Sequence, residues 1–282
     1  MCKLAAHFFE VGACWAPGAF VKGGNFVWQR FPALAAAIRH PNQGWILFDT
    51  GYDPIYFELC RDWTHRWLLW GLPAYLPKRS YLKTQLTAAG ISANEIRTII
   101  ISHFHLDHFA GVHRFPNAEL VSNRSSWEHV QTATGIEAAR KIFHPGAIDR
   151  WRIERGILLR SDSSKSWEGF QKSWDLFGDG TIRIIELPGH TPGQIGIFFR
   201  AAERQFLLVA DAVWRWENLQ GAMPLSPARL IIEDYSAFCA TISQLRQFAA
   251  QNPKICIVPS HCAVSLATAQ KIAASAHPPQ SK

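Results

Sequence analysis

The sequence lacks the features that would place it in a membrane or a secretory class. Its 282 residues contain no stretch close to the ~18 uncharged apolar residues that a transmembrane helix needs. The longest apolar candidate, residues 67–76, stops after ten residues and contains Gly71 and Pro73. The first residues also lack the continuous apolar segment of a secretory signal. We therefore expect a cytoplasmic protein with no membrane insertion.

Paired cysteines and a serine-nucleophile motif are also missing. The six cysteines are scattered without a CxxC pair, which excludes a zinc ribbon and argues against a disulfide framework. No GxSxG elbow is present to suggest a serine nucleophile. The formal charge is +7, but the chain has no long basic tract, so nucleic acid is not the expected partner.

What is present has the composition of a globular α/β protein. Most of the apolar runs are continuous rather than alternating, which predicts strands buried on both faces. These runs are residues 45–49, 98–102, 119–122, 181–187, 194–199, 206–210 and 255–258. Periodic apolar residues predict helices from Asp234 onward and over residues 265–274. We expect one domain over residues 1–282, with helices outside the sheets and a frayed tail over residues 276–282.

Residues 56–82 differ from the rest of the chain because tryptophan and tyrosine are concentrated there among basic residues. A helical insertion packed on the core is one interpretation. A lid or apolar substrate groove, or a contact in a homodimer, is another, because these aromatic side chains favour places where an apolar body meets a wet edge.

The most informative segment is TIIISHFHLDHFAG at residues 98–111, in which a buried strand leads into His103, His105, Asp107 and His108. Burying these side chains without a counter-charge would be costly, and a divalent cation removes that cost. In an extended segment, His103, His105 and Asp107 would converge on one side while His108 points elsewhere. This arrangement predicts two neighbouring ions.

Three further apolar runs end in the same kind of residue, namely His190, Asp211 and His261. Turns rich in glycine and proline follow or precede them, which favours a rigid site at the edge of a sheet. Nitrogen and carboxylate ligands without thiolate suit Zn²⁺, with Fe or Mn as alternatives.

The pattern HxHxDH, followed by His190, Asp211 and His261, resembles the metallo-β-lactamase superfamily, as does the DTG turn at residues 49–51. The resemblance implies a four-layer αβ/βα sandwich with two Zn²⁺ ions at one edge. It implies that His103, His105 and His190 hold the first ion, that Asp107, His108 and His261 hold the second, and that Asp211 bridges them. It also implies that Asp49 supports the ligands.

By the same resemblance the protein is a hydrolase in which a metal-bridging hydroxide attacks the substrate, with Asp107 and Asp211 as the catalytic carboxylates. The DTG and LPGHTPG segments are most similar to the N-acyl homoserine lactonase group, so we expect cleavage of an ester or lactone in a small-molecule substrate. Phosphodiester or thioester hydrolysis is an alternative, and a non-hydrolytic mono-iron oxygenase or a ligand-binding relative is another.

One position departs from the lactonase pattern. Lactonases usually carry a tyrosine three residues after the bridging aspartate, whereas this chain has Trp214 there, followed by Trp216. An indole N–H donates a hydrogen bond but does not readily protonate a leaving alkoxide. Trp214 and Trp216 predict either a pocket for an acyl or aromatic substrate or plain packing.

Overall fold

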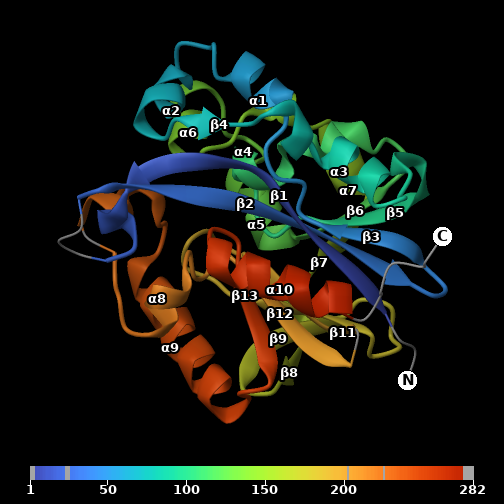
Figure 1. Cartoon of the computed structure of the whole chain (residues 1–282). Coiled ribbons are helices and arrows are strands. Elements are labelled where there is room, and N and C mark those ends of the chain that lie inside the picture. Colours follow the sequence, from blue (N-terminus) through green and yellow to red (C-terminus); the bar gives the residue numbers. More distant parts are fainter. Residues whose placement is uncertain (1–3, 23–25, 202, 225, 276–282) are drawn as a thin grey trace.

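Two β-sheets lie face to face in the computed structural model, which describes residues 4–22, 26–201, 203–224 and 226–275 (Figure 1). The tail over residues 276–282 lies outside the described residues. The first sheet has the strand order β4-β1-β2-β3-β5-β6-β7. Its strands are β1 (Ala5–Pro17), β2 (Trp28–His40), β3 (Gly44–Phe48), β4 (Ala74–Tyr75), β5 (Ile96–Ile100), β6 (Glu119–Asn123) and β7 (Ile157–Leu159).

The second sheet comes from the C-terminal half of the chain and has the order β13-β12-β11-β10-β9-β8. Its strands are β8 (Lys165–Trp167), β9 (Phe170–Asp175), β10 (Ile182–Glu186), β11 (Ile195–Ala201), β12 (Arg204–Ala210) and β13 (Ile255–Pro259). Strands β3, β5, β6 and β7 pair in parallel in the first sheet, as β12 and β13 do in the second. Parallel neighbours bring their carboxyl ends to the same edge of a sheet.

Helices cover the outer face of each sheet. Those over the first sheet are α1 (Pro54–Leu59), α2 (Arg66–Gly71), α3 (Leu82–Ala88), α4 (Leu106–Phe109), α5 (Arg124–Val130), α6 (Gly135–Arg140) and α7 (Arg150–Arg155). Helices α8 (Trp216–Leu219) and α9 (Tyr235–Gln251) lie on the second sheet, and α10 (Ala263–Ser275) packs along the open side between β1 and β13. Short 3₁₀ turns are η1 (Gly18–Phe20), η2 (Lys78–Ser80), η3 (Ala93–Glu95), η4 (Ala110–Arg114), η5 (Pro145–Ala147), η6 (Ser161–Ser163) and η7 (Ser226–Ile231).

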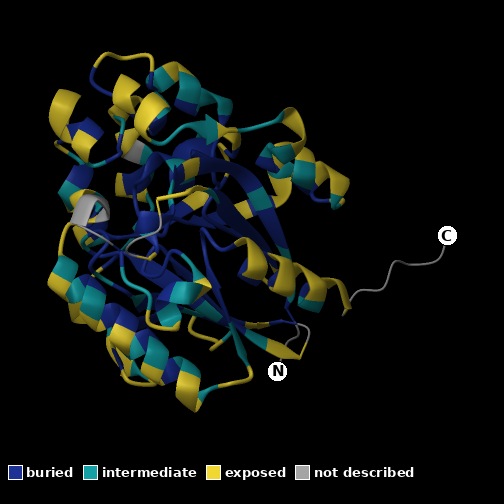
Figure 2. Ribbon diagram, turned by 60° about the vertical axis from the view of Figure 1, so that its left-hand side comes forward, coloured by how far each residue is buried: buried dark blue, intermediate teal, exposed yellow. Residues whose placement is uncertain are grey.

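Apolar side chains form three layers between these elements. One layer lies between the first sheet and its helices, one lies between the two sheets, and one lies between the second sheet and α9. Figure 2 shows the result as a buried interior along the strands, with exposed residues on the outer sides of the helices. The four-layer sandwich expected from the sequence is therefore confirmed.

The predicted elements correspond to observed ones. Each of the seven apolar runs contains or overlaps a strand, and the two predicted helices are α9 and α10. The long strands β1 and β2 were not predicted. No helix among the described residues has the length and apolar character needed to cross a bilayer.

The aromatic-rich segment at residues 56–82 is only partly helical. It contains most of α1, all of α2 and the 3₁₀ turn η2, but also strand β4, which pairs with β1 at the edge of the first sheet. The division of the chain into one domain with an insertion at this place stays a prediction.

Candidate metal centre

Five strands end at one place, and each is followed by a polar residue of the candidate site. Asp49 follows β3, the segment with His103 and His105 follows β5, and His190 follows β10. Asp211 directly follows β12. His261 follows β13 after one intervening residue. The backbone N–H of Ile195 donates to the carbonyl of Ser102 over 3.0 Å, which ties the two sheets together beside these residues.

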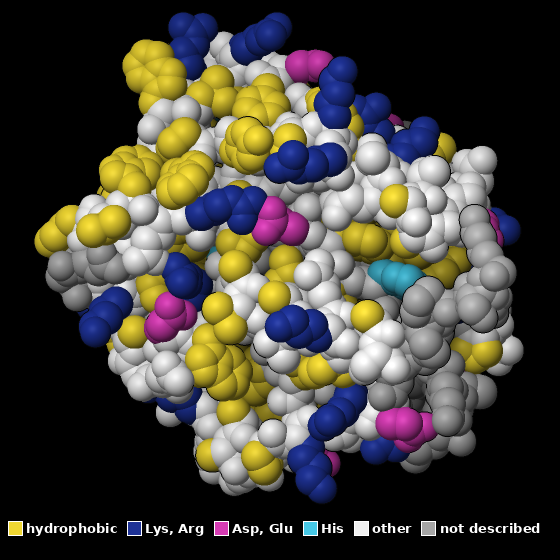
Figure 3. Space-filling model, in the orientation of Figure 1, with side chains coloured by type: hydrophobic (Ala, Val, Ile, Leu, Met, Phe, Trp, Pro, Cys, Tyr) yellow, Lys and Arg dark blue, Asp and Glu magenta, His cyan; other side chains and the backbone are white. Residues whose placement is uncertain are grey.

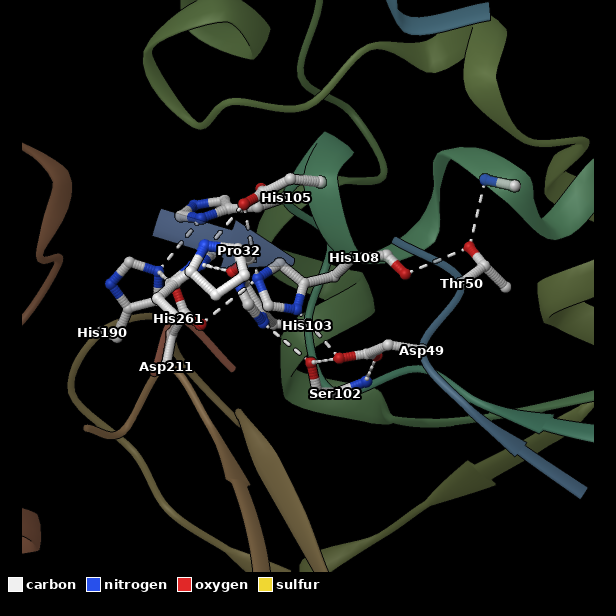
Figure 4. A network of polar contacts seen from close by, with 12 residues as sticks. Pro32, Asp49, Thr50, Ser102, His103, His105, His108, His190, Asp211 and His261 are labelled. Carbon is white, nitrogen blue, oxygen red and sulfur yellow. Dashed lines mark hydrogen bonds and ion pairs between the residues drawn. The ribbon is translucent and has the colours of Figure 1, made fainter. Parts of the chain in front are cut away.

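The first cluster consists of four buried side chains whose ligand atoms lie within 4.8 Å of one another: His103, His105, His190 and Asp211. Nε2 of His190 lies 3.0 Å from Nδ1 of His105 and 3.4 Å from Oδ2 of Asp211. Figure 4 shows these side chains converging on one point from different elements.

The second cluster consists of Asp107, His108 and His261, whose ligand atoms also lie within 4.8 Å of one another. Asp211 reaches this cluster too, since its Oδ1 lies 3.2 Å from Nε2 of His108 and its Oδ2 lies 3.1 Å from Nε2 of His261. The structure thus brings together all seven residues that the sequence suggested, in two groups with Asp211 between them.

The direction predicted for Asp107 from an extended segment was wrong. Helix α4 begins at Leu106, directly after His105, so the chain is no longer extended at Asp107. Its carboxylate consequently groups with His108 and His261 rather than with His103 and His105.

Three of the five imidazoles have a fixed orientation because their outer nitrogen is hydrogen-bonded to the protein. Nδ1 of His261 donates to the carbonyl of Pro32 over 2.7 Å, and Nδ1 of His108 donates to Asp49 over 2.9 Å. Nδ1 of His103 lies 3.0 Å from Oγ of Ser102, which itself donates to Asp49. Because these partners accept the Nδ1 proton, each Nε2 presents a lone pair to the cluster, as a metal ligand must.

Asp49 orients ligands without belonging to either cluster. Its fully buried carboxylate accepts hydrogen bonds from the backbone N–H of Ser102, from Oγ of Ser102 and from Nδ1 of His108, over 2.7–2.9 Å. Burial raises the pKa of Asp49, and these three donors oppose that shift. Asp49 adopts a left-handed backbone conformation, with φ of 55°.

The next two residues complete this turn. Thr50 donates its backbone N–H and its hydroxyl to the carbonyl of His108, and its hydroxyl accepts from the backbone N–H of Gly111. Gly51 has φ of 65°, and a Cβ there would lie 2.4 Å from the side chain of Val11. The DTG turn therefore needs its glycine and holds the helix that carries His108.

The charges of the two clusters differ. Burial lowers the pKa of His105 to about 4 and lowers the pKa values of His103 and His190 as well, so these three imidazoles are neutral at pH 7. Burial would also lower the pKa of His108, but the carboxylates of Asp211 and Asp107 hold it well above its usual value.

The donor set fits a pair of divalent cations. Nε2 of His103 is buried and has no hydrogen-bond partner, although its orientation aims it into the cluster. A buried nitrogen in that state is destabilising unless a cation accepts its lone pair. Zn²⁺ sites use imidazole and carboxylate ligands, with four or five ligands around each ion. Fe and Mn are other candidates.

A cavity opens above the two clusters. Its volume is about 570 Å³ with the opening to solvent included. The lining residues outside the two clusters are all uncharged: Cys14, Ala16, Phe20, Phe31, Tyr52, Tyr56, Leu68, Leu72, Ile142, Trp214 and Ile231. Among the described residues that line it, every carboxylate and imidazole belongs to one of the two clusters, and none is a lysine or an arginine.

The two tryptophans that the sequence suggested for the pocket have different positions. Trp214 lines the cavity and packs on His190 and Phe20, with ring centroids 5.7 and 6.1 Å away. Trp216 does not line this cavity. It begins α8 and borders a separate depression with Ile255 and Val264, because the turn after Trp214 directs it to the outside.

Most of the cavity wall was not predicted. Tyr52 directly follows the DTG turn, which is the one local signal that could have indicated it. Phe31 belongs to β2, Leu68 belongs to α2, and Leu72 directly follows α2. No sequence motif marks these residues.

A third grouping, formed by Asp62, His65 and His144, has its ligand atoms within 4.8 Å of one another. The hydroxyl of Thr64 lies 2.8 Å from Nδ1 of His65, and Nε2 of His65 lies 2.8 Å from the carbonyl of Phe143. Nδ1 of His144 accepts from the backbone N–H of Gly146. That bond leaves the proton of a neutral His144 on Nε2, so the grouping is satisfied by hydrogen bonds and does not present lone pairs to a cation.

Comparisons of the whole sequence agree with these observations. Residues 28–238 match the family model described as the metallo-beta-lactamase superfamily. A protein of Mycobacterium tuberculosis named as a probable metallo-hydrolase is 28% identical over 195 residues, which cover 64% of this chain and 56% of that protein. The N-acyl homoserine lactonase AttM of Rhizobium johnstonii is 29% identical over 208 residues, covering 69% of this chain and 71% of the relative.

A solved structure of an N-acyl homoserine lactone hydrolase, with the product N-hexanoyl-L-homoserine bound at its catalytic metal center, has the same fold. Its TM-score is 0.73, and the match covers 95% of this chain and 97% of that chain at 17% sequence identity. At this identity the similarity concerns the fold. It shows that the two sheets and their helices are arranged in both proteins in the same way.

Proposed function

Because the chain belongs to the metallo-beta-lactamase superfamily, we propose that it is a metal-dependent hydrolase that opens a lactone or cleaves a carboxylic ester. The main support is the position of two groups of ligand atoms in the floor of an apolar cavity. His103, His105 and His190 would hold one zinc ion, Asp107, His108 and His261 would hold the other, and Asp211 would be shared. Two bound cations would polarise a carbonyl oxygen and lower the pKa of the attacking water from about 15.7 towards about 7.

The cavity favours a neutral substrate over a phosphodiester. An anionic phosphate needs cationic donors beyond the metals, usually arginine or lysine, and neither occurs among the described residues that line this cavity. Phe20, Phe31 and Trp214 instead offer apolar surface for an acyl or aromatic group. We therefore place lactones and esters with such groups before phosphodiesters as substrates.

The three carboxylates of the site have different roles: one transfers a proton and two hold other residues in place. Oδ2 of Asp107 lies 3.6 Å from Nε2 of His261 and is partly exposed to the cavity, so it can accept a proton from the attacking water. Asp211 is more buried and lies between His108 and His261, which suits it to hold both clusters in register. Asp49 fixes His108 from behind and does not reach the cavity.

Cleavage also leaves an alkoxide that must gain a proton. Apart from the metal-ligating groups and the indole of Trp214, the lining residues with an O–H or S–H donor are Cys14, Tyr52 and Tyr56. Tyr56 interacts with Cys60, which does not line the cavity, whereas Tyr52 interacts with Cys14, which does. Burial raises the pKa of Tyr52 well above its usual value, so its hydroxyl keeps its proton until a strong base such as an alkoxide appears. We assign Tyr52 as the donor.

Metal analysis and a substrate panel test the proposed function. Purified protein should contain about two zinc ions per chain, and a panel of lactones, aryl esters and bis-p-nitrophenyl phosphate should show turnover of the first two classes only. His105→Ala should abolish turnover and lower the metal content, whereas His113→Ala, which changes a histidine outside both clusters, should retain them. Full activity in His105→Ala, or a preference for the phosphodiester, would refute the assignment.

A further inference from the structure

Exposed aromatic side chains are concentrated on the outside of one wall of the cavity. Eight aromatic residues are exposed among the described residues, and seven of them lie in two neighbouring parts of the chain. These parts are the strands β1, β2 and β4 with the segment before β2, and helix α2 with the turn before it. The eighth is Trp216. We call six of them the aromatic surface: Trp15, Trp28, Trp63, Trp67, Trp70 and Tyr75.

The strand pairing explains why one side of this wall faces the cavity and the other faces solvent. Residues paired across antiparallel strands point to the same face, and successive residues alternate. Cys14 pairs with Phe31, and both line the cavity. The next pair along, Trp15 with Arg30, therefore points outward, and so does Trp28, two positions from Arg30. Tyr75 pairs with Ala13, which puts it on the same outer face as Trp15.

Helix α2 and the residue after it continue the wall with the same division. Leu68 and Leu72, one turn apart, line the cavity. Trp67 and Trp70 point away from it, and Trp63 lies in the turn that leads into the helix. Trp63 and Trp70 are 73% and 78% exposed, which is unusual for the largest apolar side chain. Large exposed apolar side chains gathered in a few neighbouring elements mark an interaction site.

Basic side chains surround these aromatic residues. Residues 54–82 contain four exposed basic residues, Arg61, Arg66, Lys78 and Arg79, against two acidic ones, Glu58 and Asp62. The carboxylate of Asp62 is turned towards Thr64, His65 and His144 rather than towards the arginines. Figure 3 shows Lys and Arg side chains interspersed with hydrophobic ones on the part of the surface formed by α1, α2 and the nearby strand ends.

From this combination we propose that the aromatic surface binds the headgroup region of an anionic lipid bilayer. Tryptophan and tyrosine are the residues that prefer the boundary between lipid and water, and arginine and lysine beside them are attracted to anionic headgroups. A second copy of the chain would fit less well, because a symmetric contact would bring the same excess of positive charge against itself.

Such binding is peripheral and orients the cavity. Phe31 in β2 and Leu68 in α2 line the cavity, whereas the exposed residues of the aromatic surface on the same elements do not. A bilayer bound there contacts the same strands and helix that form the wall of an apolar cavity. The binding itself does not require hydrolysis, so it is tested separately from the proposed function.

Sedimentation with vesicles tests this binding. The zinc-loaded full chain should sediment with vesicles of phosphatidylcholine mixed with phosphatidylglycerol and should bind pure phosphatidylcholine weakly. Trp63→Ser together with Trp70→Ser should lower the partition coefficient at least about tenfold, since each side chain loses apolar burial. Arg61→Gln together with Arg66→Gln should lower it about 30-fold, at ~1 kcal/mol for each charge, and added salt should weaken binding of the unchanged protein.

Trp216→Ser is the matched control, because it removes an exposed tryptophan outside the aromatic surface and should leave vesicle binding unchanged. Sedimentation equilibrium without lipid tests whether a second copy of the chain binds the aromatic surface instead. If the protein is a dimer and the Trp63→Ser and Trp70→Ser changes dissociate it, the proposal is overturned in favour of a second copy. Failure to bind anionic vesicles, or equally tight binding to neutral ones, would also overturn it.

Discussion

Tyr52 and Tyr56 have the same side chain in the same cavity wall but interact with different cysteines. Their rings meet edge to face with centroids 5.0 Å apart, and both are buried. Tyr52 interacts with Cys14, which lines the cavity, whereas Tyr56 interacts with Cys60, which does not. This difference makes Tyr56 a control for Tyr52.

We predict that Tyr52→Phe lowers kcat for alkyl lactones by a factor of about 10² to 10⁴, because the leaving alkoxide loses its proton donor. p-Nitrophenyl esters should be affected much less, since their leaving group needs no proton. Tyr56→Phe should change neither rate much, and metal content should stay normal in both variants. Equal losses for the two kinds of substrate in Tyr52→Phe would show a structural role instead. As a readout independent of rate, calorimetric binding of the hydroxy-acid product should weaken in Tyr52→Phe alone.

The carboxylate of Asp49 also acts at the scale of a single residue. It accepts three hydrogen bonds, and an amide at this position can accept on one atom only. Asp49→Asn should therefore weaken metal binding about 10- to 100-fold, because His108 loses the acceptor that fixes its orientation. Competition with a chromophoric chelator measures this change. Asp179→Asn is the control and should bind metal normally. The Asp179 carboxylate is hydrogen-bonded to His40 and Thr181 and belongs to neither cluster.

At the scale of elements, the turn between β10 and β11 packs so closely on the start of α9 that it leaves no room for a side chain. Gly189 has φ of 132°, and a Cβ there would lie 2.2 Å from the backbone nitrogen of Phe238 in α9. The backbone N–H of Asp234, which caps α9, also donates to the carbonyl of Gly189 over 2.9 Å. The helix and the loop that carries His190 therefore fix each other.

Gly189→Ala should lower the free energy of unfolding by more than about 3 kcal/mol, since both the strain and the overlap with backbone must be relieved. It should also weaken metal binding, because His190 is the next residue. Gly169→Ala separates the two causes: Gly169 also has a positive φ, of 87°, but nothing lies within 4 Å of an added Cβ. Denaturant unfolding of both variants measures the difference. Similar losses in the two would mean that the contact with α9 is unimportant.

The sequence indicated some elements better than others for physical reasons. Strands such as β5 and β12 are short apolar runs that a polar ligand ends, so both their extent and their function are visible locally. Strand β2 contains the run Ala35–Ala37 and also Pro32, which favour a helix or a break when taken alone. It is a strand because apolar layers cover both of its faces, which is a property of the tertiary structure.

The candidate site follows the same rule. The candidate ligands could be predicted because they follow strand ends. Parallel pairing brings the ends of β3 and β5, and those of β12 and β13, to one edge, and β10 runs in the same direction as β12 because β11 is antiparallel to both. The cavity wall could not, because Phe20, Phe31 and Leu68 are brought together only by the packing of η1, β2 and α2. The alternation of His103, His105 and Asp107 suggests an extended chain and gives no sign of helix α4. This helix begins at Leu106, between His105 and Asp107.

At the scale of the whole molecule, the two clusters link both halves of the sandwich. His103 and Asp107 follow the first sheet, whereas Asp211 and His261 follow the second. Cations bound by both sets therefore bind only the folded chain and stabilise it. At a free metal concentration about 1,000 times the Kd, the stabilisation is about 4 kcal/mol. For a chain of this size we expect chelation to lower the unfolding temperature by roughly 10 °C.

The size of that loss should depend on pH. Burial lowers the pKa of His108 and of His261, but the carboxylates of Asp211 and Asp107 outweigh it and raise both in the metal-free protein. A raised pKa stabilises the folded state below the unfolded value of about 6.5, and this contribution is lost as the pH rises through the folded values. The chelated protein should thus become less stable above pH 7.

Metal binding has the opposite dependence, because cations need deprotonated ligands and compete less with protons at higher pH. The difference in unfolding temperature between zinc-loaded and chelated protein should therefore widen from pH 7 to about pH 9. His103, His105 and His190 do not change this result, since their lowered pKa values leave them neutral over the whole range. Thermal unfolding of both forms across this range measures the effect. A constant or shrinking difference would mean that Asp211 does not pair with His108 and His261 once the cations are removed.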